Sequence, residues 1–362
     1  MNRVAIVGAL AALCSCGDDG GPATPDAGPE CVVAAGTGPV MPTSGLCRQL
    51  STYRLFDDLA AQDAAADLHP FDLVVPLFSD YTDKLRWLYV PPGEAVAWRD
   101  PDAFALPVGS MLVKTFAYAV DRRSPAAGRR LLETRVLLHQ ADGWHAGSYV
   151  YRPDASDADL TIAGATLDAS WIHDDGTART NRYVVPNTNQ CLNCHGEHDE
   201  VLGPLGPRAR HLNRDGQLEG LVAAGVLTGA PADPTTWPID PAIDDAGASL
   251  DARARAWLDI NCAHCHNPRG AARTSGLDLS IGQTNPEMIG VCKTPVAAGP
   301  GSGGLLYGIV PGMPAQSILV FRMNATAPEL RMPELGRNLV HDEGVALITA
   351  WIAAMPGGCP PR

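Results

Sequence analysis

The 362-residue sequence predicts a multidomain α+β protein in which an antiparallel β-rich domain, a sandwich or a barrel, precedes two mainly α-helical domains. Two observations predict this class. Residues 71–185 contain short runs rich in Val, Leu, Thr and Tyr, and several of these alternate apolar and polar residues, as half-buried strands do. After Pro186 the runs give way to Gly- and Pro-rich connections and to segments with helical spacing. The expected boundaries divide the chain into residues 1–15, 16–48, 49–186, 187–245 and 246–362.

Five runs are the expected strands of residues 49–186: "LRWLYV", "MLVKTFAYAV", "LLETRVLLH", "HAGSYVYR" and "NRYVV". Asp142-Gly143 lies between two of them, and Asp175-Gly176 stands later in a similar setting. The Asp-Gly pair favours a tight hairpin turn, because glycine tolerates a positive φ. We therefore expect the strands to pair with their neighbours in an antiparallel way.

Three segments after residue 186 show helix signals. "QLEGLVAAGVLTG" has apolar residues at helical spacing, although its internal glycines weaken the pattern. Ser249 is a good N-cap for "LDARARAWLDINCAHCH", because its hydroxyl can accept a bond from a free N–H of the first turn. A final helix follows His341-Asp342 and ends at Pro356.

The N-terminus predicts export and lipidation. Arg3 precedes an apolar stretch, Val4–Leu13, which is too short to span a bilayer but suits a signal peptide over residues 1–15. The "LCS" before Cys16 resembles a bacterial lipobox, with Cys16 as the lipid-bearing residue. The rest of residues 16–48 begins as a Gly-, Pro- and Asp-rich tether. We expect a protein of the periplasm or cell envelope, anchored to the outer membrane through lipid.

The charge balance limits the possible partners. The chain has 40 acidic and 27 basic residues, which gives a formal net charge of −13. Nucleic acid is excluded as an expected partner, because phosphate binding needs a basic face. A basic protein partner remains compatible with this charge.

The chain contains ten cysteines, of which four stand outside the signal region and outside two repeated pentapeptides: Cys31, Cys47, Cys292 and Cys359. An even number in an exported chain predicts two disulfides, for which three pairings are possible. We favour Cys31–Cys47 and Cys292–Cys359, because each bond would then stay within one domain.

The two pentapeptides are "CLNCH" at Cys191–His195 and "CAHCH" at Cys262–His266. Cys-x-x-Cys-His is the attachment motif of c-type haem. Residues i and i+3 of a helical turn lie on one face, so both thiols can form thioethers with the two vinyl groups at one porphyrin edge. The next residue, histidine, then binds the iron. We expect two covalently bound haem c groups, held by Cys191, Cys194, His195, Cys262, Cys265 and His266.

A zinc site is the alternative explanation of the pentapeptides. It requires further Cys or His residues at ligand spacing. His198 and His211 stand near the first motif and keep this alternative open.

The second motif, with a helix before it and an amphipathic helix at the end of the chain, resembles a small class I cytochrome c domain. That resemblance implies a methionine as the sixth iron ligand, in a loop and often before proline. Met332 in "RMPELGR" fits, and Met323 in "FRMNA" is the alternative. Thioether ligation raises the reduction potential relative to a second imidazole.

The sixth ligand of the first haem is less defined, since the sequence has no methionine between Met111 and Met288. His198 and His211 are local candidates, of which His211 is better placed. A five-coordinate iron, open to small ligands or peroxide, is a further alternative. More distant candidates lie in the β region: His69, His139, His145 and His173. Three arginines could pair with haem propionates: Arg208, Arg210 and Arg214.

Longer segments carry a wider resemblance. "PLFSDYTDKLRWLYVPPG", "VGSMLVKTFAY", "YVVPNTNQCLNCH", "LDARARAWLDINCAHCHNPRGAARTSGLDL" and "RMPELGRNLVHDEGVALITAWIAAM" are similar to an uncharacterised family of exported di-haem c-type cytochromes. The similarity covers most of the chain after Arg48. Members are often encoded beside a parallel β-helix repeat protein, which the resemblance implies as a possible partner. It implies haem at both motifs and no substrate.

The expected function is therefore an anchored electron-transfer protein of the periplasm or outer membrane, passing single electrons between unknown donor and acceptor proteins. The alternative is a di-haem peroxidase or oxidase with an open coordination site at the first haem.

Overall fold

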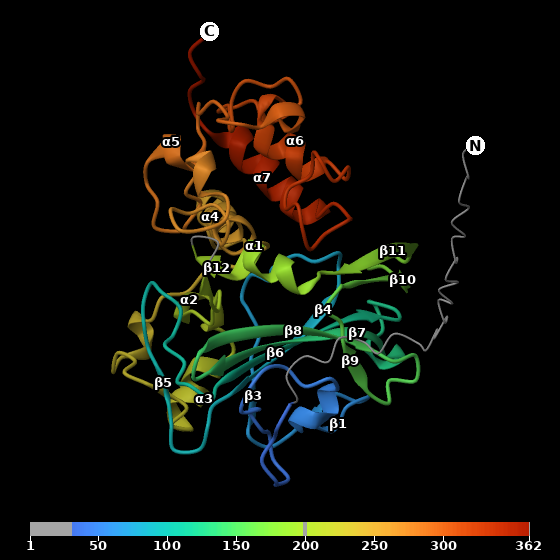
Figure 1. Ribbon diagram of the computed structural model, residues 1–362. Helices are drawn as coiled ribbons and strands as arrows, with labels where there is room; N and C mark the ends of the chain where they lie inside the picture. The colour runs from blue at the N-terminus through green and yellow to red at the C-terminus, as the bar shows by residue number, and fades with distance from the viewer. Residues whose placement is uncertain (1–30, 198–200, 362) are drawn as a thin grey trace, which may run out of the picture.

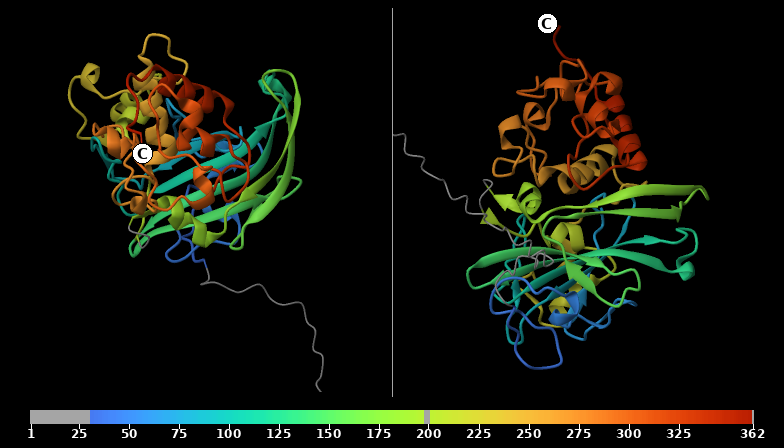
Figure 2. Two further views of the ribbon diagram at one scale, coloured as in Figure 1. Left: turned by 90° about the horizontal axis from the view of Figure 1, so that it is seen from above. Right: turned by 45° about the vertical axis from the view of Figure 1, so that its right-hand side comes forward.

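The computed structural model describes residues 31–197 and 201–361. Two lobes are stacked in it: a β lobe, residues 31–245, and a C-terminal lobe, residues 246–361 (Figure 1). The N-terminal segment, the large sheet, a smaller hairpin and the C-terminal lobe follow one another as layers in the right-hand view of Figure 2. The expected signal peptide, Cys16 and His198 lie outside the described residues.

A six-stranded antiparallel sheet is the framework of the β lobe. Its strands are, in spatial order, β3 (Leu68–Pro70), β4 (Asp83–Tyr89), β6 (Met111–Ala119), β7 (Arg129–Gln140), β8 (Gly143–Tyr151) and β9 (Ala158–Leu160). The expected strand segments form, and Ala141 and Asp142 make the β7–β8 turn directly before Gly143, which begins β8 with a positive φ of 127°. The sheet is open at β3 and β9, so the described part of the chain forms no closed barrel from it.

One face of this sheet packs on the N-terminal segment. Trp87, Val113, Val136 and Tyr149 alternate inward along β4, β6, β7 and β8 and form a core with Tyr53. The segment contributes a short 3₁₀ helix, Leu50–Tyr53, and the pair β1 (Phe56–Asp58) and β2 (Asp63–Ala64). A disulfide, Cys31–Cys47, ties its first residues to this core.

Two separate apolar clusters cover the opposite face of the sheet. At one end lie α2 (Ala209–Leu212), α3 (Gln217–Ala223), β5 (Val96–Ala97) and β14 (Leu227–Thr228). At the other end lies a hairpin of β10 (Ala165–Ile172) and β11 (Ala178–Val185), whose Trp171 and Tyr183 pack on Phe116 and Tyr118. A strip of charged side chains separates the two clusters.

The prediction of a mainly helical segment over residues 187–245 is wrong. Its helices are short: α1 (Cys191–His195), α2 and α3. Two strands, β12 (Gly196–Glu197) and β13 (Val201–Leu202), form a small ladder, and β14 pairs in parallel with β5 of the β region. Gly203, Pro204, Gly206 and Pro207 stand between these elements and interrupt helix propagation.

The prediction of a mainly helical C-terminal part is also wrong, and helices make up only 23% of the protein. The helices are α4 (Leu250–Leu258), α5 (Pro286–Ile289), α6 (Ile318–Asn324) and α7 (Asp342–Ala354), with a π-helical turn at Asp259–Ala263. Long loops with many glycines and prolines fill the space between them. The expected N-cap is confirmed, since the Ala252 N–H donates to Ser249 Oγ at 3.1 Å.

The C-terminal lobe has its own core, in which Trp257, Leu258, Ile348 and Ile352 from α4 and α7 are buried. The second disulfide, Cys292–Cys359, fastens the chain end to the loop before α6. Both disulfides are the pairings favoured above. Within residues 31–197 and 201–361 no helix combines the length and apolar character needed to cross a bilayer.

Segment 75–81 of the β lobe joins the two lobes. Val75 is buried in the C-terminal core, and the Phe78 N–H donates to Asn261 Oδ1 at 2.8 Å. The carboxylate of Asp80, 2% exposed, accepts bonds from the backbone N–H groups of Asn338 and Leu339 at 2.7 and 2.8 Å. This segment positions the loops of the C-terminal lobe over the sheet.

Candidate functional site

The first pentapeptide forms the single short helix α1. It follows a 3₁₀ turn, Thr188–Gln190, that a reciprocal capping box begins: Asn187 Oδ1 accepts from the Gln190 N–H, and Gln190 Oε1 accepts from the Asn187 N–H, each at 3.0 Å. This cap sets the helical turn immediately before Cys191. Cys191 and Cys194 therefore stand one turn apart on the same face.

The second pentapeptide leaves α4 through the π-helical turn Asp259–Ala263. Its backbone then closes a tight turn, in which the His266 N–H donates to the Cys262 carbonyl at 2.9 Å. Cys262 and Cys265 are thus again separated by one turn. All four motif thiols are free and partly buried.

The two motifs, 71 residues apart in the chain, meet where the lobes touch. Cys265 Sγ lies 3.2 Å from the Asn193 carbonyl oxygen, and the side-chain ligand atoms of Cys194, His264 and Cys265 all lie within 4.8 Å of one another. Hydrogen bonds from Cys265 and His264 lower the pKa of Cys194, although its burial opposes this effect. The predicted attachment points are therefore adjacent.

The ring of His195 is held in one tautomer. Its Nδ1 lies 3.0 Å from the Gly203 carbonyl oxygen, which can only accept a hydrogen bond, so Nδ1 carries the proton. Burial, followed by the positive charge of Lys114, lowers the pKa of His195 to about 4. The ring is neutral at pH 7, and the lone pair of Nε2 is available for a metal ion.

His266 is oriented in an equivalent way by a hydroxyl. Its Nδ1 lies 3.1 Å from Ser275 Oγ, whose own proton goes to the Ala272 carbonyl at 2.7 Å. Ser275 Oγ must therefore accept the His266 Nδ1–H. Burial lowers the pKa of His266 to about 4, with a smaller effect from His264. Both motif histidines thus present a neutral ring with a free Nε2.

Met332 lies in a loop beside the second motif. The buried Arg337 donates from Nε to the Met332 carbonyl at 2.9 Å and from Nη2 to the Arg322 and Ala325 carbonyls at 3.0 Å. The same guanidinium lowers the pKa of Cys262, against a larger rise from burial. Met332 is partly buried, while Met323 is only 5% exposed and packs in the C-terminal core.

His211 is not brought to the first motif as a free ligand. It is buried, and its Nε2 lies 3.1 Å from Asp259 Oδ2 and 3.6 Å from Asp240 Oδ2. Asp259 also accepts the Ile281 N–H at 2.8 Å. His211 therefore links the β lobe to the turn that precedes the second motif.

The other histidines proposed as ligands have places within the β lobe. His139 Nδ1 lies 3.0 Å from the Leu106 carbonyl, His145 Nε2 lies 2.9 Å from Asp142, and His173 Nδ1 accepts from Trp171 at 3.3 Å. His69 lies in the edge strand β3.

Two of the arginines predicted to bind propionates face carboxylates of the protein. Arg210 lies 3.6 Å from Asp100, and Arg214 lies 2.8 Å from Asp215. Burial raises the pKa of Asp240 to about 6 against the opposing charges of His211, Arg210 and Arg208, whereas the hydrogen bond from His211 lowers the pKa of Asp259 against its burial. These groups bind the 208–214 segment in place.

Sequence reasoning missed a group of basic side chains beneath α1: Lys84, Arg86, Lys114 and Arg135. Burial, followed by Arg135 and Arg86, lowers the pKa of Lys114 to about 7, and burial lowers that of Lys84 well below its usual range. The sequence does contain a signal for this group. Charged residues stand at alternate positions in "DKLRW" and "ETRV", and one stands in "VKTF", within strands that are otherwise largely apolar.

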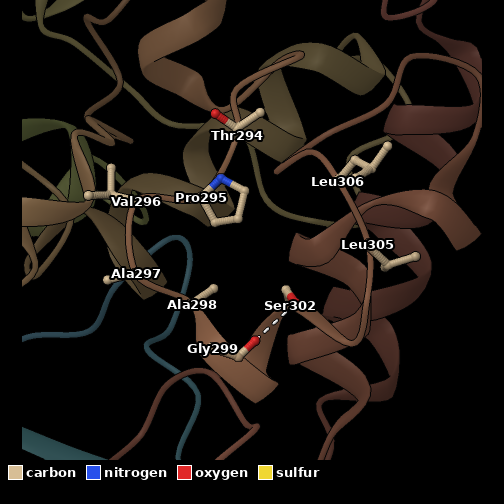
Figure 3. Close-up of a pocket in the computed structure, with 9 residues that line it drawn as sticks. All are labelled: Thr294, Pro295, Val296, Ala297, Ala298, Gly299, Ser302, Leu305 and Leu306. Carbon is tan, nitrogen blue, oxygen red and sulfur yellow. Dashed lines mark hydrogen bonds between the residues drawn. The ribbon is translucent and has the colours of Figure 1, made fainter. Parts of the chain in front are cut away.

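A hollow of about 330 Å³ lies elsewhere, in the 294–306 loop of the C-terminal lobe (Figure 3). Its lining has no Cys, His or charged side chain, and the Ser302 hydroxyl that faces it is bonded to the Gly299 carbonyl at 3.0 Å. These residues do not provide ligands for a metal or a redox group.

Comparison of the chain with protein-family models, with curated proteins and with solved structures finds no match.

Proposed function

We propose that this protein is a di-haem c-type cytochrome that transfers electrons in the cell envelope. One observation carries the proposal: each Cys-x-x-Cys-His motif has both thiols on one helical turn and a histidine whose Nδ1 proton is already committed. Nε2 of each ring is then the only nitrogen that can bind iron. This donor set, two thiols and one oriented imidazole, fits covalent haem better than a redox dithiol, for which the histidine has no role.

The residues have distinct roles in this proposal. Cys191, Cys194, Cys262 and Cys265 hold the groups, and His195 and His266 bind the irons. Bound haem supplies one-electron chemistry, and the protein sets its potential by ligand type and burial. Met332 is the proposed sixth ligand of the second iron, because Arg337 fixes its loop beside Cys262.

The contact between the motifs favours a carrier with two coupled centres. Cys194 and Cys265 come from different motifs and have their sulfur atoms within 4.8 Å of each other. Two haems attached at these points share one site between the lobes. We propose that an electron enters at one haem and leaves from the other, toward redox proteins of unknown identity. The proposal includes a lipid anchor at Cys16 and a parallel β-helix repeat protein as a candidate partner.

A di-haem peroxidase or oxidase is the second candidate, and the position of His211 favours it. Because His211 Nε2 is engaged by Asp259, this ring does not complete the coordination of the first iron in this conformation. An iron with an open position binds CO or cyanide. If neither ligand changes the spectrum of the reduced or oxidised protein, the enzyme candidate is excluded.

The deciding experiment is intact mass and absorption spectroscopy of protein matured with a haem-attachment system. We expect a mass that corresponds to two covalent haems. Cys191→Ala/Cys194→Ala and Cys262→Ala/Cys265→Ala should each lose one haem, whereas Cys292→Ala/Cys359→Ala, which removes cysteines outside the motifs, should keep both. Bare polypeptide mass with bound zinc would refute the proposal and favour a metal site at Cys194, His264 and Cys265.

A further inference from the structure

The charged strip on the sheet lies in one cross-strand row. Arg86 of β4 is opposite Lys114 of β6, which is opposite Arg135 of β7. Lys84 is opposite Phe116 in the next row, and the cations of Lys84, Lys114 and Arg135 lie 5.9, 5.0 and 4.4 Å from the Phe116 ring centre. Like charges at directly opposite positions of a sheet destabilise it. Such a row therefore calls for anionic partners.

Within the described residues, each of the two arginines has a carboxylate hydrogen-bond partner, whereas neither lysine has one. Arg135 makes two bonds to Glu133, at 2.6 and 3.0 Å, and Arg86 donates to Asp72 at 2.8 Å. Among the described residues, Lys84 Nζ donates only to the Thr82 carbonyl, at 3.0 Å. Lys114 Nζ has no hydrogen bond to any residue within 31–197 and 201–361.

The lysines are unusual in this chain. The sequence contains three, Lys84, Lys114 and Lys293, and the other 24 of its 27 basic side chains are arginines. Two of the three lie together on the strip, and both are partly buried. A flexible ammonium group with three donors suits an acceptor supplied by a ligand.

The strip lies next to the first motif. The charge of Lys114 acts on the ring of His195, that of Cys194 acts on Lys114, and that of Arg135 acts on Cys191, so these groups are electrostatic neighbours. On the same face of the sheet, Leu88 and Leu112 belong to the apolar cluster with α2 and α3. Phe116 and Val150 belong to the cluster with the β10–β11 hairpin. The cations thus lie between two apolar clusters, on the face of the sheet toward α1 (Figure 1).

We propose that Lys84 and Lys114 bind the propionate carboxylates of the haem that Cys191, Cys194 and His195 hold. This inference rests on the proposed function. A haem is apolar around its ring and has two carboxylates at one edge, which matches an apolar surface interrupted by two lysines that no carboxylate of the described residues hydrogen-bonds. Arg86 and Arg135 add to the positive field, while their own partners hold them in the sheet.

The test compares Lys114→Gln, Lys114→Arg and, as the matched control, Lys293→Gln in the C-terminal lobe. Haem content is counted by mass first. Reduction potentials and resonance Raman spectra of the propionate bending modes are then measured. Lys114→Gln should keep both haems, lower one of the two potentials and shift the propionate modes of that haem. A positive charge stabilises the reduced form, so its loss lowers the potential. Lys114→Arg should restore the potential and the propionate modes of that haem to wild-type values. Lys293→Gln should change neither the potentials nor the propionate modes.

The outcomes separate the two proposals. A wild-type protein without haem refutes the proposed function itself. A wild-type protein with two haems, combined with unchanged potentials and Raman modes in Lys114→Gln and in Lys84→Gln, refutes only the propionate site. A change of Lys114→Gln to a high-spin spectrum also refutes it, because Lys114 would then be an iron ligand.

A carboxylate bound to Lys84 and Lys114 could also come from a soluble anion instead of a haem propionate. Wild-type protein is titrated with acetate at constant ionic strength while both potentials are followed. Propionate binding predicts constant potentials, since the lysines are already occupied. A potential that moves with acetate concentration would show that the strip binds an exchangeable anion and would overturn the assignment.

Discussion

At the scale of single residues, the histidines of the two motifs depend on groups far outside the pentapeptides. Gly203 fixes the ring of His195, and Ser275 fixes that of His266, each through Nδ1. The motif predicts which residues bind iron. It does not predict which nitrogen is free, because that depends on a carbonyl eight residues later and a hydroxyl nine residues later.

Met332 carries the clearest single-residue prediction. Met332→Ala should change the spectrum of one haem and lower its potential, because a thioether ligand raises the potential. Met323→Leu, which replaces a core side chain with one of similar volume, should leave both spectra intact and cost less than about 1.5 kcal/mol of unfolding free energy. If instead the Met323 variant changes a spectrum and the Met332 variant does not, Met323 is the ligand.

His341 predicts a pH dependence of stability. Burial lowers its pKa to about 4, and its Nδ1 accepts from Trp257 Nε1 at 3.3 Å, so the folded ring is neutral. An unfolded histidine takes up a proton near pH 6.5, so the unfolded chain binds more protons between pH 6.5 and 4. The stability that depends on the neutral ring is therefore present above pH 6.5 and lost as the pH falls toward 4, by about 2 kcal/mol between pH 7 and 5.

Denaturant unfolding of wild type and His341→Asn at several pH values checks this effect. Asparagine keeps an acceptor for Trp257 but does not titrate. The stability advantage of wild type over the variant should shrink as the pH falls from 7 to 5. An advantage that stays constant with pH would show that His341 does not titrate on unfolding in this range.

At the scale of elements, the segment around Asp80 predicts how the C-terminal loops are held. Asp80→Ala removes the acceptor of two backbone N–H groups and of Asn181 Nδ2, which lies 2.8 Å from Oδ2. Buried donors left without partners should cost roughly 2–4 kcal/mol. Asp168→Ala, at a side chain 91% exposed, is the control and should be neutral in the same unfolding assay.

The strands could be predicted from sequence because the runs are short and rich in Val, Leu, Thr and Tyr, and several alternate apolar and polar residues over their own length. The relation between strands could not. Lys84, Lys114 and Arg135 are isolated charges in three runs, and only the register of β4, β6 and β7 brings them together. The contact between Cys194 and Cys265 likewise depends on how the lobes pack, which no local pattern encodes.

At the scale of the whole molecule, the helix signals predict more helix than the chain forms, because its glycines and prolines interrupt helices between those signals. The N-cap at Ser249 and the final helix were correct, because caps and apolar spacing act locally. The chain also contains 37 glycines and 31 prolines, which favour loops between such helices. The regions that contain the two motifs are therefore largely irregular chain held by hydrogen bonds, not helical bundles.

The Cys292–Cys359 disulfide predicts the stability of that irregular chain. Its cysteines are 67 residues apart, whereas Cys31 and Cys47 are 16 apart. A longer closed loop restricts the unfolded chain more, so Cys292→Ala/Cys359→Ala should cost about 2–4 kcal/mol, more than Cys31→Ala/Cys47→Ala. Thermal unfolding of the two double variants compares their losses of stability. Equal losses would contradict the loop-length argument.

The meeting of both pentapeptides where the lobes touch also has a consequence for biogenesis. The sulfur atoms of the two motifs become hard to reach once the two halves of the chain have closed on each other. If haem is joined there, attachment must come before final closure, while the polypeptide is still open. Each cofactor would then be part of the template on which the halves assemble.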